Sequence, residues 1–145
     1  MSYFGGVYAA NDDYIAIAYK KHKVIDIIQK SNMKLCNRLF FKNFDANKFH
    51  IENDMLKSDY EEISFFYKIF ASEDCFYVLY WNDTVEKIGN GSCKTKMYKI
   101  DFNGKILSHY TFNIQIGNFQ INGDEIVAVG MDPVEKEMLI YKGKL

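Results

Sequence analysis

Three side chains that could ligate a metal ion alternate with other residues in one short segment, at His50, Glu52 and Asp54. On a strand, residues two apart leave the same face, so these three would point together. One imidazole and two carboxylates could hold a divalent transition ion. The alternative is a solvated polar face, which we favour because the strand assignment of this segment is itself open. We therefore expect no metal and no cofactor, with these three residues as weak candidates.

Covalent catalysis has little support in the sequence. The chain has no G-x-S-x-G elbow, and none of Cys36, Cys75 and Cys93 lies near a histidine in the sequence. The cysteines are odd in number and form no C-x-x-C pair, and Cys75 next to an apolar run is typical of a buried thiol. The residue types favour a protein that is not an enzyme.

Two segments invite an anion-binding interpretation. Residues 89–94, GNGSCK, resemble a phosphate loop but lack its full spacing and do not follow a strand, so we expect a flexible hairpin tip. His22 lies within a cluster of Lys20, Lys21 and Lys23, for which we expect a solvated hairpin loop, with an anion contact as the alternative. The net charge of −1 argues against nucleic acid as a partner.

The composition is that of one globular domain rich in aromatic residues. The chain has 145 residues, of which 48% are apolar and 26% charged, with 12 Phe and 11 Tyr. Flat rings favour strands because they pack well on a pleated surface. No apolar run approaches the roughly 20 residues of a membrane span. The first residues do not have the pattern of a signal peptide.

The strongest pattern is a repeat. Residues 7–19, 69–81 and 119–131 each contain an apolar run, a polar turn with an aspartate, and a longer apolar run. The recurring Asp12, Asp74 and Asp124 are predicted turn formers, because Asp hydrogen-bonds its own backbone. The second runs, 14–19 and 76–81, are apolar on both faces and are predicted to be central strands between layers.

Further strands extend each unit. Apolar runs at 24–28 and 35–41, at 97–102 and 106–112, and at 138–141 follow the repeated hairpins. Asn103-Gly104 predicts a type I′ hairpin turn. The fold class is therefore all-β, with repeated four-stranded antiparallel sheets in units 3–41, 65–112 and 117–145, the last with three strands. Residues 42–64 form a connection with one short element, for which residues 55–63 fit a helix or a strand.

These units resemble the blades of six-bladed β-propellers of the TolB-like and NHL-like kind. The clearest copy is Ile69–Trp81 followed by Met97–Lys105, and the resemblance covers about two thirds of the chain. It implies a partial β-propeller, the C-terminal half of a ring, since a six-bladed ring needs roughly 250 residues. A fragment of a longer propeller, or association with a second copy, is the expectation. The compartment stays open; the resemblance allows a periplasmic or secreted fragment.

The candidate binding residues follow from differences between the repeats. Tyr19, Trp81 and Met131 occupy matching positions at the end of the second run of each unit, where propeller blades meet one rim. There they form a recognition surface or, alternatively, pack in the core. His22 and Asp83, in the segments that follow Tyr19 and Trp81, complete the set.

The sequence favours a non-catalytic binding or protein-interaction module. Its expected partner is another protein or a second copy, joined through open sheet edges. The first alternative is a small closed β-barrel or sandwich that binds an apolar small molecule. The second is a propeller-type hydrolase or lyase fragment, because fold analogy alone does not exclude catalysis.

Overall fold

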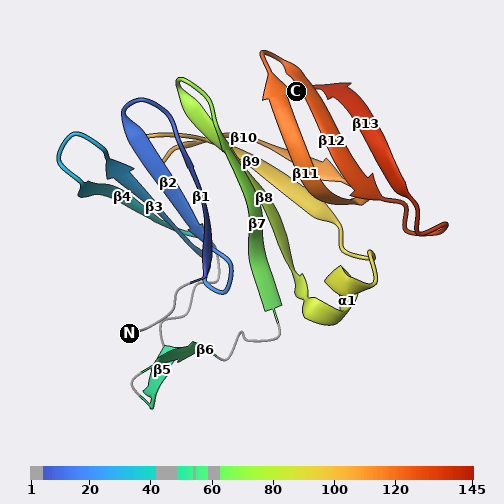
Figure 1. Cartoon of the computed structure of the whole chain (residues 1–145), viewed down its shortest axis with the longest axis horizontal. Coiled ribbons are helices and arrows are strands. Elements are labelled where there is room, and N and C mark those ends of the chain that lie inside the picture. The colour runs from blue at the N-terminus through green and yellow to red at the C-terminus, as the bar shows by residue number, and fades with distance from the viewer. Residues whose placement is uncertain (1–4, 42–48, 54, 59–62) are drawn as a thin grey trace.

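Three antiparallel sheets, arranged side by side, make up most of the described part of the protein (Figure 1). The computed structural model describes residues 5–41, 49–53, 55–58 and 63–145. The N-terminal sheet contains β1 (Gly6–Ala10), β2 (Tyr14–Tyr19), β3 (Val24–Gln29) and β4 (Lys34–Phe40). The central sheet contains β7 (Ile63–Ala71), β8 (Cys75–Thr84), β9 (Thr95–Asp101) and β10 (Ile106–Phe112). The C-terminal sheet contains β11 (Gln115–Asn122), β12 (Glu125–Met131) and β13 (Met138–Lys144).

The prediction of an all-β protein with repeated antiparallel sheets of four, four and three strands is confirmed. Each sheet is a meander in which consecutive strands pair, and the first strands β1 and β11 both lie against β7. This is the propeller-like arrangement of neighbouring blades. The described strands form no closed barrel, because each sheet ends in two different edge strands. The barrel alternative is therefore wrong for this part of the chain.

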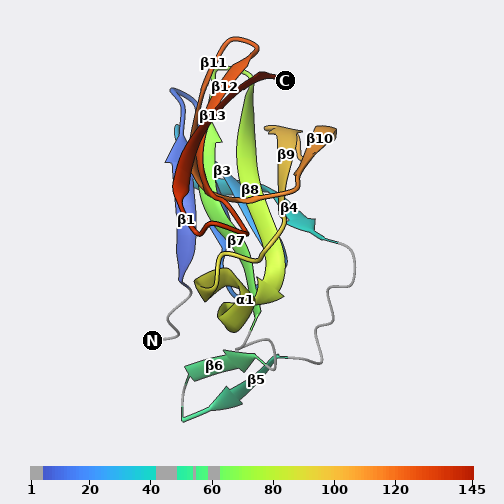
Figure 2. The same ribbon diagram turned by 90° about the vertical axis from the view of Figure 1, so that its right-hand side faces the viewer.

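Two short elements lie at one end of the sheets. β5 (Phe49–Glu52) pairs with β6 (Met55–Ser58) in a separate hairpin, which lies beyond the three sheets in Figure 2. The one helix among the described residues, α1 (Val85–Gly89), is a single turn that follows β8. Residues 55–58, which fit a helix or a strand by sequence, are a strand because Glu52 pairs with Met55 across a tight turn. Asn53 makes that turn with a φ of 52°.

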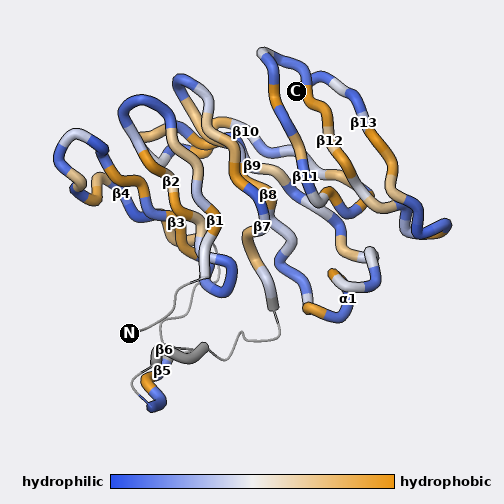
Figure 3. The backbone as a smooth tube through the Cα atoms, viewed as in Figure 1, coloured by the Kyte–Doolittle hydropathy of each residue, from blue (hydrophilic) through white to orange (hydrophobic). Residues whose placement is uncertain are grey.

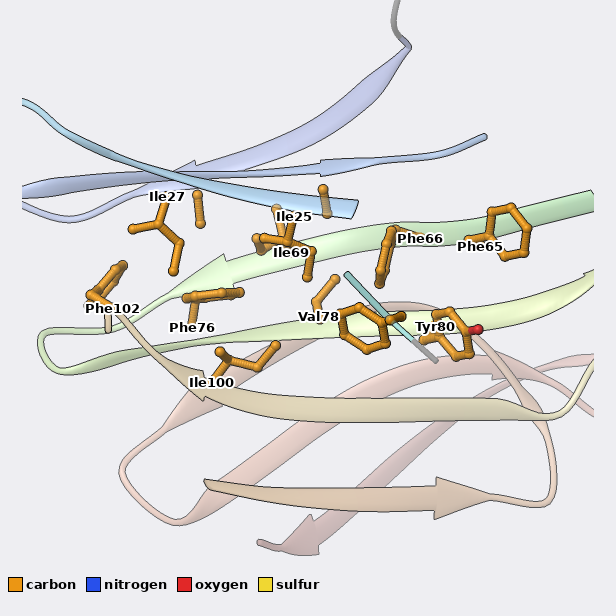
Figure 4. Packing of buried hydrophobic residues seen from close by; sticks show 13 residues of the cluster. Ile25, Ile27, Phe65, Phe66, Ile69, Phe76, Val78, Tyr80, Ile100 and Phe102 are labelled. Atoms are coloured by element: carbon orange, nitrogen blue, oxygen red, sulfur yellow. The ribbon is translucent and has the colours of Figure 1, made fainter. Parts of the chain in front are cut away.

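The central sheet is buried on both faces. Phe76, Val78 and Tyr80 of β8 pack against Ala16, Ala18, Ile25 and Ile27 of the N-terminal sheet (Figure 4). The alternating residues Cys75, Tyr77 and Leu79 pack against Ile116, Phe119, Ile121, Ile126 and Ala128 of the C-terminal sheet. Every residue from Cys75 to Trp81 is buried, so the prediction of a strand between two layers is confirmed for β8.

β2 differs from β8. Its Ala16 and Ala18 are buried against the central sheet, whereas Ile15 and Ile17 on the opposite face are only half-buried. No second described sheet stacks on that face. The prediction that β2 lies between two layers is therefore wrong, and the reason is that the N-terminal sheet has a neighbour on one side only.

In the β1–β2 turn, a residue other than the predicted aspartate makes the side-chain contacts. In the β1–β2 turn, the side-chain oxygen of Asn11 accepts the backbone N–H groups of Asp13 and Tyr14 at 3.0 and 2.8 Å. Its amide nitrogen donates to the backbone oxygens of Ser72 and Glu73 in the β7–β8 turn, at 3.3 and 2.8 Å. The turn-forming role assigned to Asp12 thus belongs to Asn11, which also ties two sheets together.

The β9–β10 turn is not of type I′. Only Gly104 has positive φ, at 86°, and the Gly104 N–H donates to the backbone oxygen of Asp101 at 3.1 Å. This is a type I turn followed by a glycine bulge. The Asp101 carboxylate makes this geometry the favoured one, because it accepts the N–H groups of Asn103 and Lys105 at 3.0 and 2.8 Å.

Replacing Asn11 by alanine is expected to lower the free energy of unfolding by about 1–2 kcal/mol, because it removes the turn contacts and the two contacts to the neighbouring sheet. The matched control is Asp12→Ala, next to it in the same turn, with an expected change within about 0.5 kcal/mol. Urea denaturation measures both. Equal losses in the two variants would contradict the role of Asn11.

Met33 in the β3–β4 turn has a φ of 54° and is 66% exposed. A side chain in the left-handed region costs about 1–2 kcal/mol, against a backbone entropy cost for glycine of about 0.5–1 kcal/mol. Met33→Gly is therefore expected to leave stability unchanged or raise it by up to about 1 kcal/mol. The control Met138→Gly, at an exposed strand position, should lower it. A loss of stability in Met33→Gly would show that no strain is relieved.

Candidate functional site

The second strands of the three sheets run towards the same end of the molecule. Figure 1 shows β2, β8 and β12 pointing to the end where α1 lies. Tyr19 and Met131 are the last residues of β2 and β12, and Trp81 lies three residues before the end of β8. The tertiary structure therefore brings the loops that follow the three predicted residues to one end of the protein.

Trp81 is a packing residue in this structure. Its ring is 7% exposed and stacks on Tyr67 with centroids 3.9 Å apart. Its indole N–H donates to the backbone oxygen of Ile116 at 3.1 Å, which joins β8 to the C-terminal sheet. Met131 lies against Gly91 in the segment after α1, where an added Cβ would meet the Met131 sulfur. Trp81 and Met131 thus hold the central and C-terminal sheets together at this end.

Tyr19 belongs to a polar cluster on the outer face of the N-terminal sheet. Its hydroxyl donates to Asp26 at 2.9 Å, and Arg38 binds the same carboxylate with two N–H groups at 2.6 and 2.8 Å. Burial, together with the bond to Asp26, raises the pKa of Tyr19, and the same carboxylate raises the pKa of Arg38. Asp26 was not predicted, although it is the one charged residue in the run 24–28.

The basic segment after β2 is packed rather than fully solvated. The Lys23 ammonium lies 5.0 Å from the centre of the Phe65 ring, and Lys23 is only 8% exposed. Burial lowers the pKa of Lys23 and of His22. The His22 ring lies edge-on to Tyr19, with centroids 6.2 Å apart. The expectation of a solvated loop is thus wrong for Lys23, because the aromatic core reaches this end of the sheets.

Asp83 lines a hollow at the same end. Its carboxylate accepts from the Lys87 ammonium of α1 at 3.3 Å and from the backbone N–H of Thr84 at 2.9 Å. The hollow has a volume of about 330 Å³, and Ser92 and Lys94 line it as well. Residues 89–94 are therefore not simply a hairpin tip; they include the end of α1 and one wall of this hollow.

Within the described residues, the tertiary structure brings no further ligand or activating group to the metal and thiol candidates. His50 and Glu52 lie two apart on β5, and Asp54 lies outside the described residues. Within the described ranges, no three His, Cys, Asp or Glu side chains gather at one point. Cys93 is buried, and burial raises its pKa to about 12, so its thiol stays protonated at neutral pH.

The outer faces of the two terminal sheets carry exposed apolar side chains. On the N-terminal sheet, Tyr8, Leu35 and Phe40 are 75%, 50% and 58% exposed. On the C-terminal sheet, Val127, Met138 and Ile140 are 41%, 62% and 72% exposed. Register pairs place Leu35 opposite the half-buried Ile28, and Ile140 opposite the half-buried Val129.

Comparison with known proteins finds similar solved structures but no family. No protein-family model and no curated protein matches the chain. A protein of unknown function from Bacteroides caccae, solved by crystallography, is similar with a TM-score of 0.49 and 10% sequence identity. The match covers 98% of this chain and 46% of that protein, so the chain spans less than half of its length. In the described part of the chain, no helix has the length and apolarity to cross a membrane.

Because of the Asp26 cluster, we expect Arg38→Ala and Asp26→Ala to lower the free energy of unfolding by different amounts. Arg38→Ala leaves a carboxylate whose side chain is 6% exposed without its cation, whereas Asp26→Ala leaves an arginine that is 48% exposed and stays hydrated. We expect losses of about 3 kcal/mol for Arg38→Ala and about 1–2 kcal/mol for Asp26→Ala. Urea denaturation of both variants and the double variant measures this. An equal or larger loss in Asp26→Ala would contradict the explanation.

Proposed function

We propose that this protein is a non-catalytic interaction module that pairs with a second copy of itself through the outer faces of its terminal sheets. The observation that carries the proposal is the apolar character of both outer faces. In the central sheet, each apolar face of β8 is covered by a neighbouring sheet. In the terminal sheets, only the inner faces are covered within the described residues.

The exposed residues form continuous patches rather than scattered positions. On the N-terminal sheet, Tyr8 pairs with Ile17, and Ile15, Ile28 and Leu35 pair in register across β2, β3 and β4. On the C-terminal sheet, Val127, Val129 and Ile140 lie on one face of β12 and β13. Figure 3 shows hydrophobic stretches along β2, β12 and β13. Contiguous apolar patches of this kind mark interaction surfaces in soluble proteins.

The positions of the two outer faces, one on each terminal sheet, favour a dimer with two-fold symmetry. If the N-terminal sheet of one copy packs on the C-terminal sheet of the other, a two-fold axis repeats the contact and closes six sheets into a ring. Such a dimer covers both apolar faces of each copy at once. It also gives each terminal sheet the two neighbours that the central sheet already has.

The available area suits a stable dimer. Strands spaced about 4.8 Å apart and about six residues long give each sheet face roughly 400 Å². Two faces per copy therefore reach about 800 Å² on each partner, which is the usual size of a specific interface. The resemblance of the repeats to TolB-like and NHL-like blades supports the same arrangement, because six such units make a ring.

Light scattering coupled to size exclusion at micromolar concentration tests the proposal, with a dimer as the expected species. Tyr8→Lys and Ile140→Lys place a charge on each face at highly exposed positions, so the fold of the single copy is retained. Each is expected to weaken the dimer at least tenfold, which is about 1.4 kcal/mol. The matched control is Val134→Lys, in the β12–β13 loop and 79% exposed, which should leave the dimer unchanged.

Three outcomes would overturn the proposal. One is a monomer for the unaltered protein. Another is an open series of larger species, which a contact that does not close would produce. The last is a dimer weakened by only one of the two substitutions, since both faces must be buried in the ring.

A further inference from the structure

We propose that the hollow beside Asp83 binds the phosphate group of a small phosphate monoester. This site lies at the α1 end of the central sheet, away from the outer sheet faces, and is independent of the proposed dimer. Its volume of about 330 Å³ falls at the lower end of the range for small-molecule sites.

The hollow gathers three lysines from two parts of the chain. Lys87 comes from α1, Lys94 from the segment just before β9, and Lys96 from the second position of β9. Lys94 and Lys96 both line the hollow. Lys96 lies between Tyr80 of β8 and Thr111 of β10 in the strand register, which places it in the middle of the site.

Neutral donors complete the lining. Ser92 and Thr111 contribute hydroxyl groups, and Asn82 contributes an amide. Burial raises the pKa of Tyr80, which also lines the hollow, to about 12, so its hydroxyl is neutral at physiological pH.

The one carboxylate in the lining, that of Asp83, cancels only part of the positive charge of the three lysines. Asp83 is paired with Lys87 at 3.3 Å and accepts the Thr84 N–H, and its side chain is 24% exposed. With three ammonium groups and one carboxylate, the lining has a net charge of +2 (3 − 1), in a chain whose net charge is −1. A dianion therefore matches the site in charge.

The chemistry favours a phosphate monoester over other anions. A monoester carries a charge near −2 at neutral pH and three strong acceptor oxygens, which several lysine and hydroxyl donors can share. A nucleic acid would need a longer cationic track than this single hollow offers.

Isothermal titration of the full chain at neutral pH and low salt, with inorganic phosphate and with glycerol phosphate, tests the proposal. Both probes are expected to bind with 1:1 stoichiometry and with affinity that falls as salt is added. Lys96→Gln removes the central cation and is expected to weaken binding of both about tenfold. Its matched control is Lys105→Gln in the β9–β10 turn, an exposed lysine outside the hollow and outside the outer sheet faces, for which no change is expected.

The proposal fails if neither probe binds at about 10 mM, a concentration at which a site of even about −3 kcal/mol would be detected. It also fails if Lys96→Gln binds as the unaltered protein does, while circular dichroism shows that the variant is folded. Succinate that binds as tightly as glycerol phosphate would overturn the assignment to phosphate. Light scattering of the same samples separates these results from the oligomeric state.

Discussion

The structure depends on a central sheet that is apolar on both faces. Seven consecutive residues of β8, Cys75 to Trp81, are buried, and their side chains alternate between two separate clusters. Such a strand cannot face water on either side, so it requires a sheet against each face. The N-terminal and C-terminal sheets meet that requirement, each with the inner face of its own strands.

The same constraint explains what the terminal sheets leave exposed. Each has one neighbour, yet its second face carries isoleucine, valine and aromatic residues of the kind that the central sheet buries. On the N-terminal sheet, the Tyr19–Asp26–Arg38 cluster satisfies a nearly buried carboxylate among apolar residues. On the C-terminal sheet, Asn118, Gln120 and Lys142 share the outer face with Val127 and Val129. An apolar face with one satisfied polar cluster suits a packed interface, because the cluster defines which surfaces match.

Polar contacts between sheets set their relative positions where apolar packing does not. Asn11 joins the β1–β2 turn to the β7–β8 turn, the backbone N–H of Phe65 donates to the backbone oxygen of Lys20 at 2.9 Å, and the Trp81 indole N–H donates to Ile116 of the C-terminal sheet. These contacts lie at both ends of the sheets. The hollow itself forms within the central sheet, where the segment after α1 lies beside Lys96 and its register neighbours Tyr80 and Thr111.

The sequence by itself determined the strand order, the all-β class and the grouping into sheets of four, four and three strands, because apolar alternation and turn residues are local signals. It also predicted Trp81 and Asp83 as binding residues, and both line the hollow at the α1 end of the central sheet. It did not determine which faces are covered, since Ile17 in β2 and Tyr77 in β8 have the same local pattern and only the number of neighbouring sheets distinguishes them. Likewise, only the tertiary structure showed that Lys96, Thr111 and Lys87 share one hollow, because strand register and the path of α1 are set by long-range pairing.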